Sequence, residues 1–407
     1  MANTLKFGTD GNWATKKGST LAYNDENGNF KPLPFNFDRD TSATRVNKEG
    51  LIEVVSNNEP RIDYKDDSKG ALLLEPSRSN LVTYSEDFSQ SVWNKTNCTI
   101  ISNNSISPNG TQNADKLVEN NIINSFSNRY STSVSYTSGL KYTTSIFAKS
   151  DGRDLMIRSY NGSSDIDTIF DLSNGIVLLG NGEIKDYGNG WYRCSHTITA
   201  QSTINTSFSA SFVLVNNSSI SYQGDGTSGI YIYGAMLEQG YATSYIPTQG
   251  SVVTRNQDSC VDGGNDQVIN STEGVLYYES KVHSLNGDKA ISVSTGSYND
   301  SVSIGVYGGV FQSRIRQGGD FKHFISPNGV NLLNNNKIAI MYSQSNIKIF
   351  VNGSLKSTVS GVTFNVDLDE VNFTRADNTD KYYGLIKDLR VYNEALTDQE
   401  LINLTKI

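Results

Sequence analysis

The sequence predicts an all-β protein, with two jelly-roll-type antiparallel β-sandwiches after an irregular N-terminal arm and connector. Short apolar runs with period-two alternation recur along the 407 residues, and Gly, Asn, Asp or Ser separates them. Hydrophobic residues make up only 36% and charged residues 19%, which favours a polar, turn-rich β-structure over a helical enzyme. The 22 tyrosines and 16 phenylalanines suit strands and exposed binding faces.

The first 80 residues contain little that could form a core. Residues 1–36 are rich in Gly, Asn and Lys, and Pro32 and Pro34 favour an extended path, so we expect a docking arm that becomes ordered on a partner. Residues 37–80 are a predicted connector, in which two short strands flank a turn at residues 48–50. Isolated hairpins are marginally stable, so the burst Leu72–Leu74 must be buried on the first sandwich, on sister chains or on another protein.

Residues 81–254 carry the first sandwich pattern. Runs such as "YTTSIFAKS", "DLMIRSY" and "GIYIYGAMLE" are separated by turn segments such as "SNG", which is typical of an antiparallel sandwich. Residues 255–407 carry a second series, including "GVLYYESKVHS", "SVSIGVYG" and "NIKIFVNGSLKSTVSG". We therefore predict four segments, with boundaries after residues 36, 80 and 254.

Two local signals lie near the C-terminus. Asn352 and Gly353 both tolerate positive φ, and together they predict a tight hairpin turn. The one convincing helix is "LTDQELINL", where Thr397 and Glu400 form a capping box and Leu401 can face inward.

Charge and cysteine content exclude several classes of partner. The net charge of −8 and the pI near 5.1 give no support for a nucleic-acid or anionic-membrane partner. The N-terminus lacks the pattern of a signal peptide, and no stretch reaches the ~18 apolar residues of a membrane span, so we expect no membrane insertion. Cys98, Cys194 and Cys260 are far apart and odd in number, which favours buried free thiols over a disulfide or a metal site. No cofactor is expected.

Signals for catalysis are mostly negative. The sequence has no G-x-S-x-G, H-E-x-x-H or Walker motif. His196, His283 and His323 are isolated, and structural or surface roles are expected for them. The segment "GDGTSG" at residues 224–229 matches G-x-G-x-x-G, but a strand follows it where a dinucleotide site needs a helix, so we interpret it as a turn.

One pair of carboxylates resembles a hydrolytic pair. In "VDLDEV", Asp367 and Asp369 share a strand face, whereas Glu370 falls on the opposite face, which departs from the Glu-x-Asp-x-Glu strand of some glucanases on the lectin-like sandwich. Solvated carboxylates are the favoured interpretation. We therefore expect no enzymatic activity and assign no catalytic residue.

The segment from residue 297 to 324, "SYNDSVSIGVYGGVFQSRIRQGGDFKHF", suits sugar recognition. Aromatic rings stack on apolar sugar faces, and arginine forks onto carboxylates and hydroxyls. We take Tyr298, Tyr307, Arg314 and Arg316 as the candidate carbohydrate-binding residues. The alternative is that the phenylalanines of this segment are core and the arginines pair with nearby Asp; the segment's phenylalanines are Phe311, Phe321 and Phe324. If this site fails, Trp93 and Trp191 of the first sandwich are the next candidates.

The order of several motifs resembles a known family. "FDRDTSATRVNKEGLIEVV", "LLLEPSRSNLVTYSEDFS", "NGWYRC" and "YIYGAMLEQGYATSYIPT" resemble a module of bacteriophage tail-fibre and other virion-surface proteins, over roughly residues 35–255. In that family, the region after the leader resembles a carbohydrate-binding-module jelly roll. Residues 270–407 resemble a laminin-G-like or concanavalin-A-like domain, because "NKIAIMYSQSNIKIFVNGSLKS" is followed by "YGLIKDLRVYNEALTDQELINL". No ligand residue is transferred from either family.

The resemblance implies a fibre, spike or receptor-binding protein, made in the host cytoplasm and located on the virion surface or tail. Such a protein attaches to host surface glycan without cleaving it, and contacts other virion proteins through its N-terminal arm. A homotrimer is expected, because the connector is poor in apolar residues and fibre proteins of this family are commonly trimeric. The alternatives are a structural virion subunit, for capsid decoration or tail assembly, whose lectin-like domains make only protein contacts, and a glycan hydrolase. An exposed aromatic cluster would favour the receptor binder, and a buried one the structural subunit.

Overall fold

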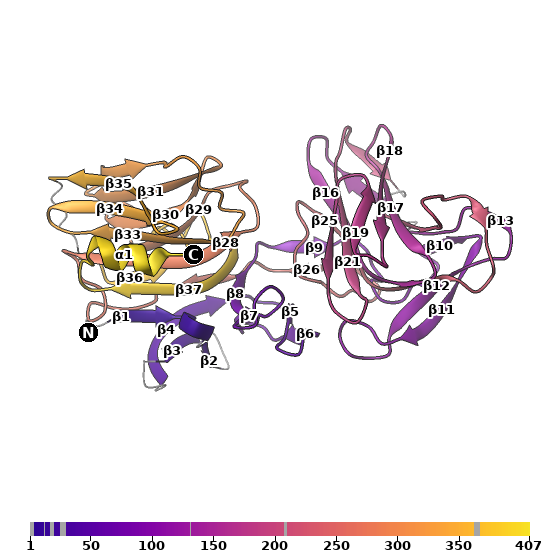
Figure 1. Ribbon diagram of the computed structural model, residues 1–407, viewed down its shortest axis with the longest axis horizontal. Coiled ribbons are helices and arrows are strands. Elements are labelled where there is room, and N and C mark those ends of the chain that lie inside the picture. Colours follow the sequence, from indigo (N-terminus) through magenta and orange to yellow (C-terminus); the bar gives the residue numbers. More distant parts are fainter. Residues whose placement is uncertain are drawn as a thin grey trace. The chain divides into compact units, whose positions relative to one another are not determined.

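The computed structural model describes residues 4–11, 13–16, 20–24, 30–130, 132–206, 210–361 and 367–407. These residues form antiparallel sheets with one α-helix, which confirms the predicted all-β class (Figure 1). The chain divides into two compact units that interlace along the sequence. The terminal unit comprises Met1–Ser42, Val55–Pro76 and Asn256–Ile407, and the central unit comprises Ala43–Val54 and Ser77–Arg255.

The terminal unit is a sandwich of two antiparallel sheets. The larger sheet has the order β35-β34-β33-β28-β37-β8-β7, and β1 also pairs with β37. Its strands are β1 (Thr4–Phe7), β7 (Arg61–Asp63), β8 (Ala71–Leu74), β28 (Gly274–Val282), β33 (Asn336–Tyr342), β34 (Asn346–Val351), β35 (Ser354–Ser360) and β37 (Gly384–Tyr392). The smaller sheet has the order β32-β31-β30-β29-β36. Its strands are β29 (Lys289–Ser294), β30 (Ser301–Tyr307), β31 (Val310–Gln317), β32 (Asp320–Ile325) and β36 (Glu370–Asn372).

Alternation along these strands builds one core between the two sheets. Leu276 of β28, Ile304 of β30 and Ile340 of β33 are fully buried in it, because every second side chain of each strand points inward. A third sheet, with the order β2-β3-β4-β27, belongs to the same unit. Its strands are β2 (Ala14–Lys16), β3 (Thr20–Asn24), β4 (Phe30–Asp38) and β27 (Ser259–Val261), and the short 3-10 helix η1 (Thr9–Gly11) precedes them.

The C-terminal helix and the hairpin before it follow the sequence prediction. Helix α1 (Asp398–Thr405) begins after Thr397, whose side chain and that of Glu400 form the predicted capping box. Leu401 of α1 is buried in a small apolar cluster with residues of β28, β33 and β34. Asn352 and Gly353 have φ values of 52° and 76° and join β34 to β35 as a tight turn.

The N-terminal residues differ from the predicted irregular arm. Strand β1 pairs antiparallel with β37, from Thr4 opposite Tyr392 to Phe7 opposite Leu389, and Phe7 is only 1% exposed. Strand β4 pairs with β27, and Phe35 of β4 packs on Phe7 with the ring centroids 5.2 Å apart. These residues gain a core from strands hundreds of positions later in the chain, so their own composition could not show it.

Much of the predicted connector, residues 55–76, also belongs to the terminal unit. Strand β8 pairs with β37 on one side and with β7 on the other, and the side chains of Leu72 and Leu74 are buried in the terminal core. The Leu72–Leu74 burst is therefore covered within its own chain, and it supplies no argument for sister chains. Residues 43–54 instead belong to the central unit, where β5 (Ala43–Val46) and β6 (Ile52–Val55) form the predicted hairpin.

A second sandwich of two six-stranded sheets makes up the central unit. One sheet has the order β10-β14-β23-β17-β18-β19 and the other β11-β12-β25-β16-β21-β20. Their strands are β10 (Trp93–Thr96), β11 (Cys98–Ser105), β12 (Ala114–Glu119), β14 (Ser127–Tyr130), β16 (Lys141–Asp151), β17 (Asp154–Tyr160), β18 (Asp165–Asp171), β19 (Ile176–Leu179), β20 (Gly182–Asp186), β21 (Tyr192–Thr199), β23 (Ser211–Val215) and β25 (Gly229–Gln239). Ile146, Ile157 and Phe212 are fully buried between the sheets. Three two-stranded pairs complete the unit: β9 (Arg78–Asn80) with β26 (Val253–Arg255), β13 (Ile123–Asn124) with β24 (Tyr222–Gln223), and β15 (Val134–Tyr136) with β22 (Ile204–Thr206).

A buried ion network lies in the terminal unit, within a few residues of the points where the chain leaves and re-enters it. Asp258 accepts hydrogen bonds from Arg39 Nη1 at 3.1 Å and from Arg61 Nη2 at 2.5 Å, and Glu75 Oε2 accepts from Arg61 Nη1 at 2.8 Å. All four side chains are at most 3% exposed. Burial opposes the charge on Arg61, yet Asp258 and Glu75 hold its pKa above the ordinary value. The network thus ties three separate chain segments together.

Candidate functional site

The candidate residues lie on the outer face of the smaller sheet of the terminal unit. On β30 and β31, Val302, Ile304 and Ile315 point into the core. The residues that alternate with them along each strand, including Arg314 and Arg316 on either side of Ile315, therefore point to the opposite face. Strand pairing places Arg314 opposite Ser303 and Arg316 opposite Ser301, so small side chains lie beside both arginines.

A bulge between β31 and β32 adds two aromatic rings to this face. Arg314 pairs with Phe324 and Arg316 pairs with Phe321, with the register shift between Ile315 and Arg316. A regular strand would place residues three apart on opposite faces, but the extra residue of a bulge restores them to the same face. The rings of Phe321 and Phe324 meet edge to face with centroids 5.7 Å apart, and they are 50% and 52% exposed.

Arg314 covers Tyr307. Its guanidinium carbon lies 3.4 Å from the centroid of the Tyr307 ring, which leaves that ring 1% exposed. Arg314 also donates hydrogen bonds to Gln312 Oε1, through Nη2 at 2.6 Å, and to the Tyr298 hydroxyl, through Nη1 at 3.2 Å. Burial raises the pKa of Tyr307 to about 12. Tyr307 therefore supports Arg314 from below and is too buried to contact a ligand itself.

Arg316 lies between two aromatic rings. Its guanidinium carbon is 4.3 Å from the Tyr298 centroid and 4.5 Å from the Phe321 centroid. Its Nη2 donates to the carbonyl oxygen of Gly319. The guanidinium carbon of Arg375 also lies over the Tyr298 ring, 4.4 Å from its centroid. We call Tyr298, Tyr307, Arg314, Arg316, Phe321 and Phe324 the aromatic–arginine cluster.

The structure thus brings all four predicted residues together, but Tyr307 is buried beneath Arg314, so its predicted contact with a ligand was wrong. The binding roles of Tyr298, Arg314 and Arg316 stay predictions. Phe311 is core, as the alternative interpretation held, but Phe321 and Phe324 are half exposed. Neither Arg314 nor Arg316 forms an ion pair with a carboxylate in the described part of the chain. Arg375 was missed, because it comes from a distant loop and nothing in the sequence links it to Tyr298.

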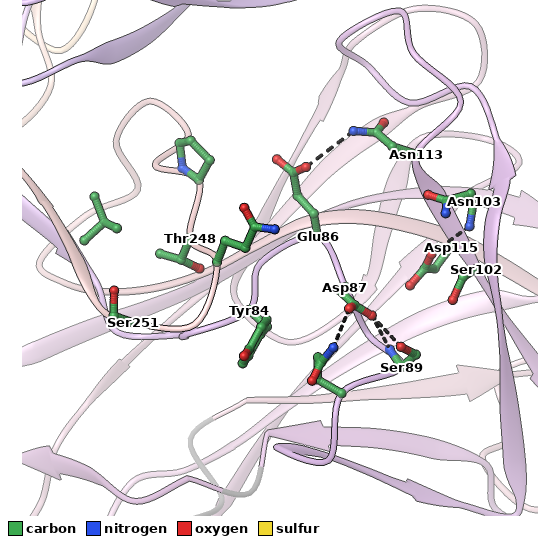
Figure 2. A pocket seen from close by; sticks show the side chains of 14 residues that line it. Tyr84, Glu86, Asp87, Ser89, Ser102, Asn103, Asn113, Asp115, Thr248 and Ser251 are labelled. Atoms are coloured by element: carbon green, nitrogen blue, oxygen red, sulfur yellow. Dashed lines mark hydrogen bonds between the residues drawn. The ribbon is translucent and has the colours of Figure 1, made fainter.

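The central unit contains a polar pocket of about 730 Å³ that the sequence did not predict (Figure 2). Glu86, Asp87 and Asp115 line it together with Tyr84. Each of these three carboxylates accepts hydrogen bonds from other residues of the central unit. Glu86 accepts from the Tyr233 and Tyr245 hydroxyls at 3.0 and 2.9 Å. Asp115 accepts from the backbone amides of Phe88 and Asn103 at 3.0 and 2.9 Å, and Asp87 accepts from Ser89 and Gln90.

These bonds and burial shift two of the pKa values in the pocket. Burial raises the pKa of Asp115 more than its two backbone hydrogen bonds lower it. Burial also opposes ionisation of Asp87, but the hydrogen bonds from Ser89 and Gln90 leave its pKa lowered. The three carboxylates hold the loops of the pocket in place, which is a structural role.

The two reserve candidates of the first sandwich are core residues. Trp93 is 1% exposed and Trp191 is 3% exposed. Their indole nitrogens donate to backbone carbonyls, Trp93 to Tyr84 at 2.9 Å and Trp191 to Ile106 at 3.0 Å. Neither ring is presented to a ligand, so the suggestion of a site at these tryptophans was wrong.

The remaining motifs behave as structural features. Asp367 and Asp369 are exposed on either side of the buried Leu368, as the solvated interpretation predicts. In "GDGTSG", the side chain of Asp225 accepts from the backbone amides of Thr227 and Ser228, and the strand β25 follows this turn. The buried His196 bonds to the Thr168 hydroxyl at 2.8 Å.

The three cysteines of the chain lie in the protein interior. Cys98, Cys194 and Cys260 are buried free thiols, as predicted, and burial raises the pKa of each. Among the residues that the structure describes, no group of three His, Cys, Asp or Glu side chains could hold a metal ion. Within the same ranges, no helix is long and apolar enough to cross a bilayer.

The fold defines a β-sandwich protein, and one family model matches part of its C-terminal region. Residues 279–402 match the family model Laminin_G_3, described as the concanavalin A-like lectin/glucanases superfamily. This match confirms the lectin-like domain predicted at the C-terminus. A search of curated proteins gave no match.

Similar solved structures share only part of the chain. One is the CBM40 of the Ruminococcus gnavus IT-sialidase bound to α2,3-sialyllactose, at 22% identity, 34% of this chain, 84% of that chain and a TM-score of 0.30. Another is domain 4 of AbnA, a GH43 extracellular arabinanase from Geobacillus stearothermophilus, in complex with arabinotriose, at 16% identity, 41% of this chain, 82% of that chain and a TM-score of 0.29. The receptor-binding domain of botulinum neurotoxin type G has 14% identity, with 36% of this chain, 39% of that chain and a TM-score of 0.28.

Proposed function

We propose that the protein binds carbohydrate through the aromatic–arginine cluster, and that this binding attaches a virion to glycan on the host surface. The observation that carries the proposal is the pair of half-exposed rings, Phe321 and Phe324, beside two arginines on the outer face of a lectin-like sandwich. Exposed rings offer a stacking surface for the apolar face of a sugar, and the arginines offer hydrogen-bond donors.

Attachment to a host without cleavage is the finer part of the proposal. The motifs over roughly residues 35–255, which resemble those of phage tail-fibre and virion-surface proteins, support it. The solvated state of Asp367 and Asp369 supports binding without hydrolysis, because a glycosidase needs two carboxylates facing each other across a cleft.

The contact with other virion proteins is proposed for residues 1–36, of which β1 and most of β4 are paired with strands of the terminal unit. A homotrimer is no longer supported by the Leu72–Leu74 burst, which is buried within the chain. Joining several weak sugar sites would still raise avidity by ~10²–10⁴. A measurement of the molecular mass in solution shows whether the protein forms an oligomer and so joins several sugar sites.

The test is adsorption of purified protein to host cells. The variant Phe321→Ser with Phe324→Ser removes two half-exposed rings, so we expect an unchanged melting temperature and clearly weakened adsorption. The variant Arg314→Ala with Arg316→Ala should weaken adsorption as well. Lys356→Ala is the matched control, since Lys356 is an exposed basic residue on β35 of the opposite sheet. Unchanged adsorption of both cluster variants would favour the structural-subunit alternative, in which the sandwich makes only protein contacts.

A further inference from the structure

Each of the two arginines of the cluster has N–H donors that no acceptor among the described residues uses. A guanidinium has five N–H donors. Arg316 donates one bond, from Nη2 to Gly319, while its buried Nε has no partner within the described residues. Arg314 donates to Gln312 and Tyr298. The acceptors of Arg314 are neutral groups, so these hydrogen bonds do not balance the positive charge of the arginine.

The neighbouring Arg375 is different, because its charge is already matched. It forms ion pairs with Asp377 at 2.7 Å and with Asp380 at 2.9 Å. Arg375 therefore stacks on Tyr298 with its charge already balanced, and the carboxylates of Asp377 and Asp380 are already paired with it. The positive charge of Arg314 also favours the ionised form of Asp380, but the two side chains form no ion pair in the described structure.

The aromatic rings make an unmatched charge costly once a ligand covers it. Arg316 is held between Tyr298 and Phe321, and the guanidinium carbon of Arg314 lies 3.4 Å from the Tyr307 centroid, so both guanidinium groups are restricted and partly shielded from water. A neutral ligand that covers them removes more water without supplying an opposite charge. An anionic group supplies that charge and matches the forked geometry of arginine.

We infer that the ligand of the aromatic–arginine cluster is an anionic saccharide, with its carboxylate or phosphate on Arg314 and Arg316 and its apolar ring face on Phe321 or Phe324. This inference rests on the proposed carbohydrate binding and goes further by naming the chemical class. The carboxylate of a uronic acid and the phosphate of a sugar phosphate share the required chemistry.

Calorimetric titration of the full chain tests the inference with defined probes. The probes are tri-galacturonic acid, its neutral methyl ester, and glucose 1-phosphate. We expect the acid to bind at least about tenfold more tightly than its ester, because hydrogen bonds to charged groups exceed neutral ones by this order. Binding of the acid should weaken as salt rises, while binding of the ester should not. Tight binding of glucose 1-phosphate with weak binding of the acid would assign the site to phosphate instead of carboxylate.

Variants separate the charge from the stacking. Arg316→Gln should lose about tenfold for the acid and change the ester by less than about twofold. Arg316→Lys should recover only part of this loss, because lysine lacks the fork. Equal affinity of acid and ester, with both lost in Phe321→Ser, would overturn the inference and leave carbohydrate binding intact. If none of the probes binds and host polysaccharide does not bind either, the proposed function fails as well.

Discussion

The buried network around Asp258 should be one of the most sensitive positions of the terminal unit. Asp258 accepts hydrogen bonds from Arg39, from Arg61 and from the backbone amide of Glu75, the last at 2.7 Å. Asp258→Ala removes both acceptor oxygens and with them all three hydrogen bonds, which leaves Arg39 and Arg61 buried with Glu75 as the remaining carboxylate of the network. We therefore expect a large loss of stability, caused by uncompensated buried charge.

The size of the effect follows from the burial of the partners. Breaking a buried ion pair by removing one partner costs about 3–5 kcal/mol. The terminal unit has roughly 200 residues, and for a unit of this size each kcal/mol lowers the melting temperature by about 2–4 °C. The melting temperature of Asp258→Ala should thus fall by about 6–20 °C. Asp258→Asn keeps one acceptor oxygen and loses the charge, so its loss should be smaller.

Thermal unfolding followed by circular dichroism measures this shift, and hydrogen exchange locates it. Faster exchange is expected in β7, β8 and β27, which carry or adjoin the network, while β16 and β25 of the central unit should be unaffected. The control is Asp266→Ala, since Asp266 is exposed in the same unit and should shift the melting temperature by no more than about 2 °C. If Asp258→Ala melts within the range of this control, the network contributes no stability and the reasoning from burial is refuted.

Three further changes test other parts of the fold. Burial lowers the pKa of His196 and His323 from 6.5 to about 4. Between these two pH values the folded state therefore binds fewer protons than the unfolded state. The free energy of unfolding should thus fall by about 2 kcal/mol per histidine as the pH drops from 7 to 5. Urea unfolding at both pH values, repeated with His196→Gln and His323→Gln, should show a smaller pH-dependent loss in each variant. Thr397→Ala removes the capping box of α1 and should cost about 1 kcal/mol by the same measurement, whereas no loss would mean that the last turn is held by Leu401 alone. Gly305→Ala would place a Cβ 1.9 Å from the backbone oxygen of Lys289, so it should force β29 and β30 apart and lower the melting temperature, and an unchanged value would contradict the close approach of these strands.

Local patterns in the sequence were enough to predict the sandwich class, the C-terminal helix and the hairpin at Asn352 and Gly353. Each of these depends on residues close together in the chain, such as the alternation along β17 or the pair Thr397 and Glu400. The turn nature of residues 224–229 was predictable for the same reason, because the following residues alternate as a strand.

The cluster was only half predictable, because part of it depends on the register between strands. Arg314 and Arg316 are two apart, so period two alone places them on one face. Phe321 and Phe324 are three apart, and only the bulge between β31 and β32 brings them to the same face as the arginines. A bulge of this kind has no signature in the sequence of either strand. The alternative that both rings are core was therefore reasonable until the register was known.

The interlacing of the two units was beyond prediction from local patterns, and it changes how the N-terminal residues must be tested. Phe7 and Phe35 contact each other and also Phe373, with centroids 6.4 and 5.3 Å from its ring. Deleting residues 1–36 would remove two buried rings from this core, and each Phe→Ala change in a core typically costs about 3–5 kcal/mol. A deletion variant that fails to join particles would therefore report lost folding as readily as lost docking. Docking is better probed at Lys6, which alternates with the buried Leu5 and Phe7 on β1 and can be changed while both core side chains remain.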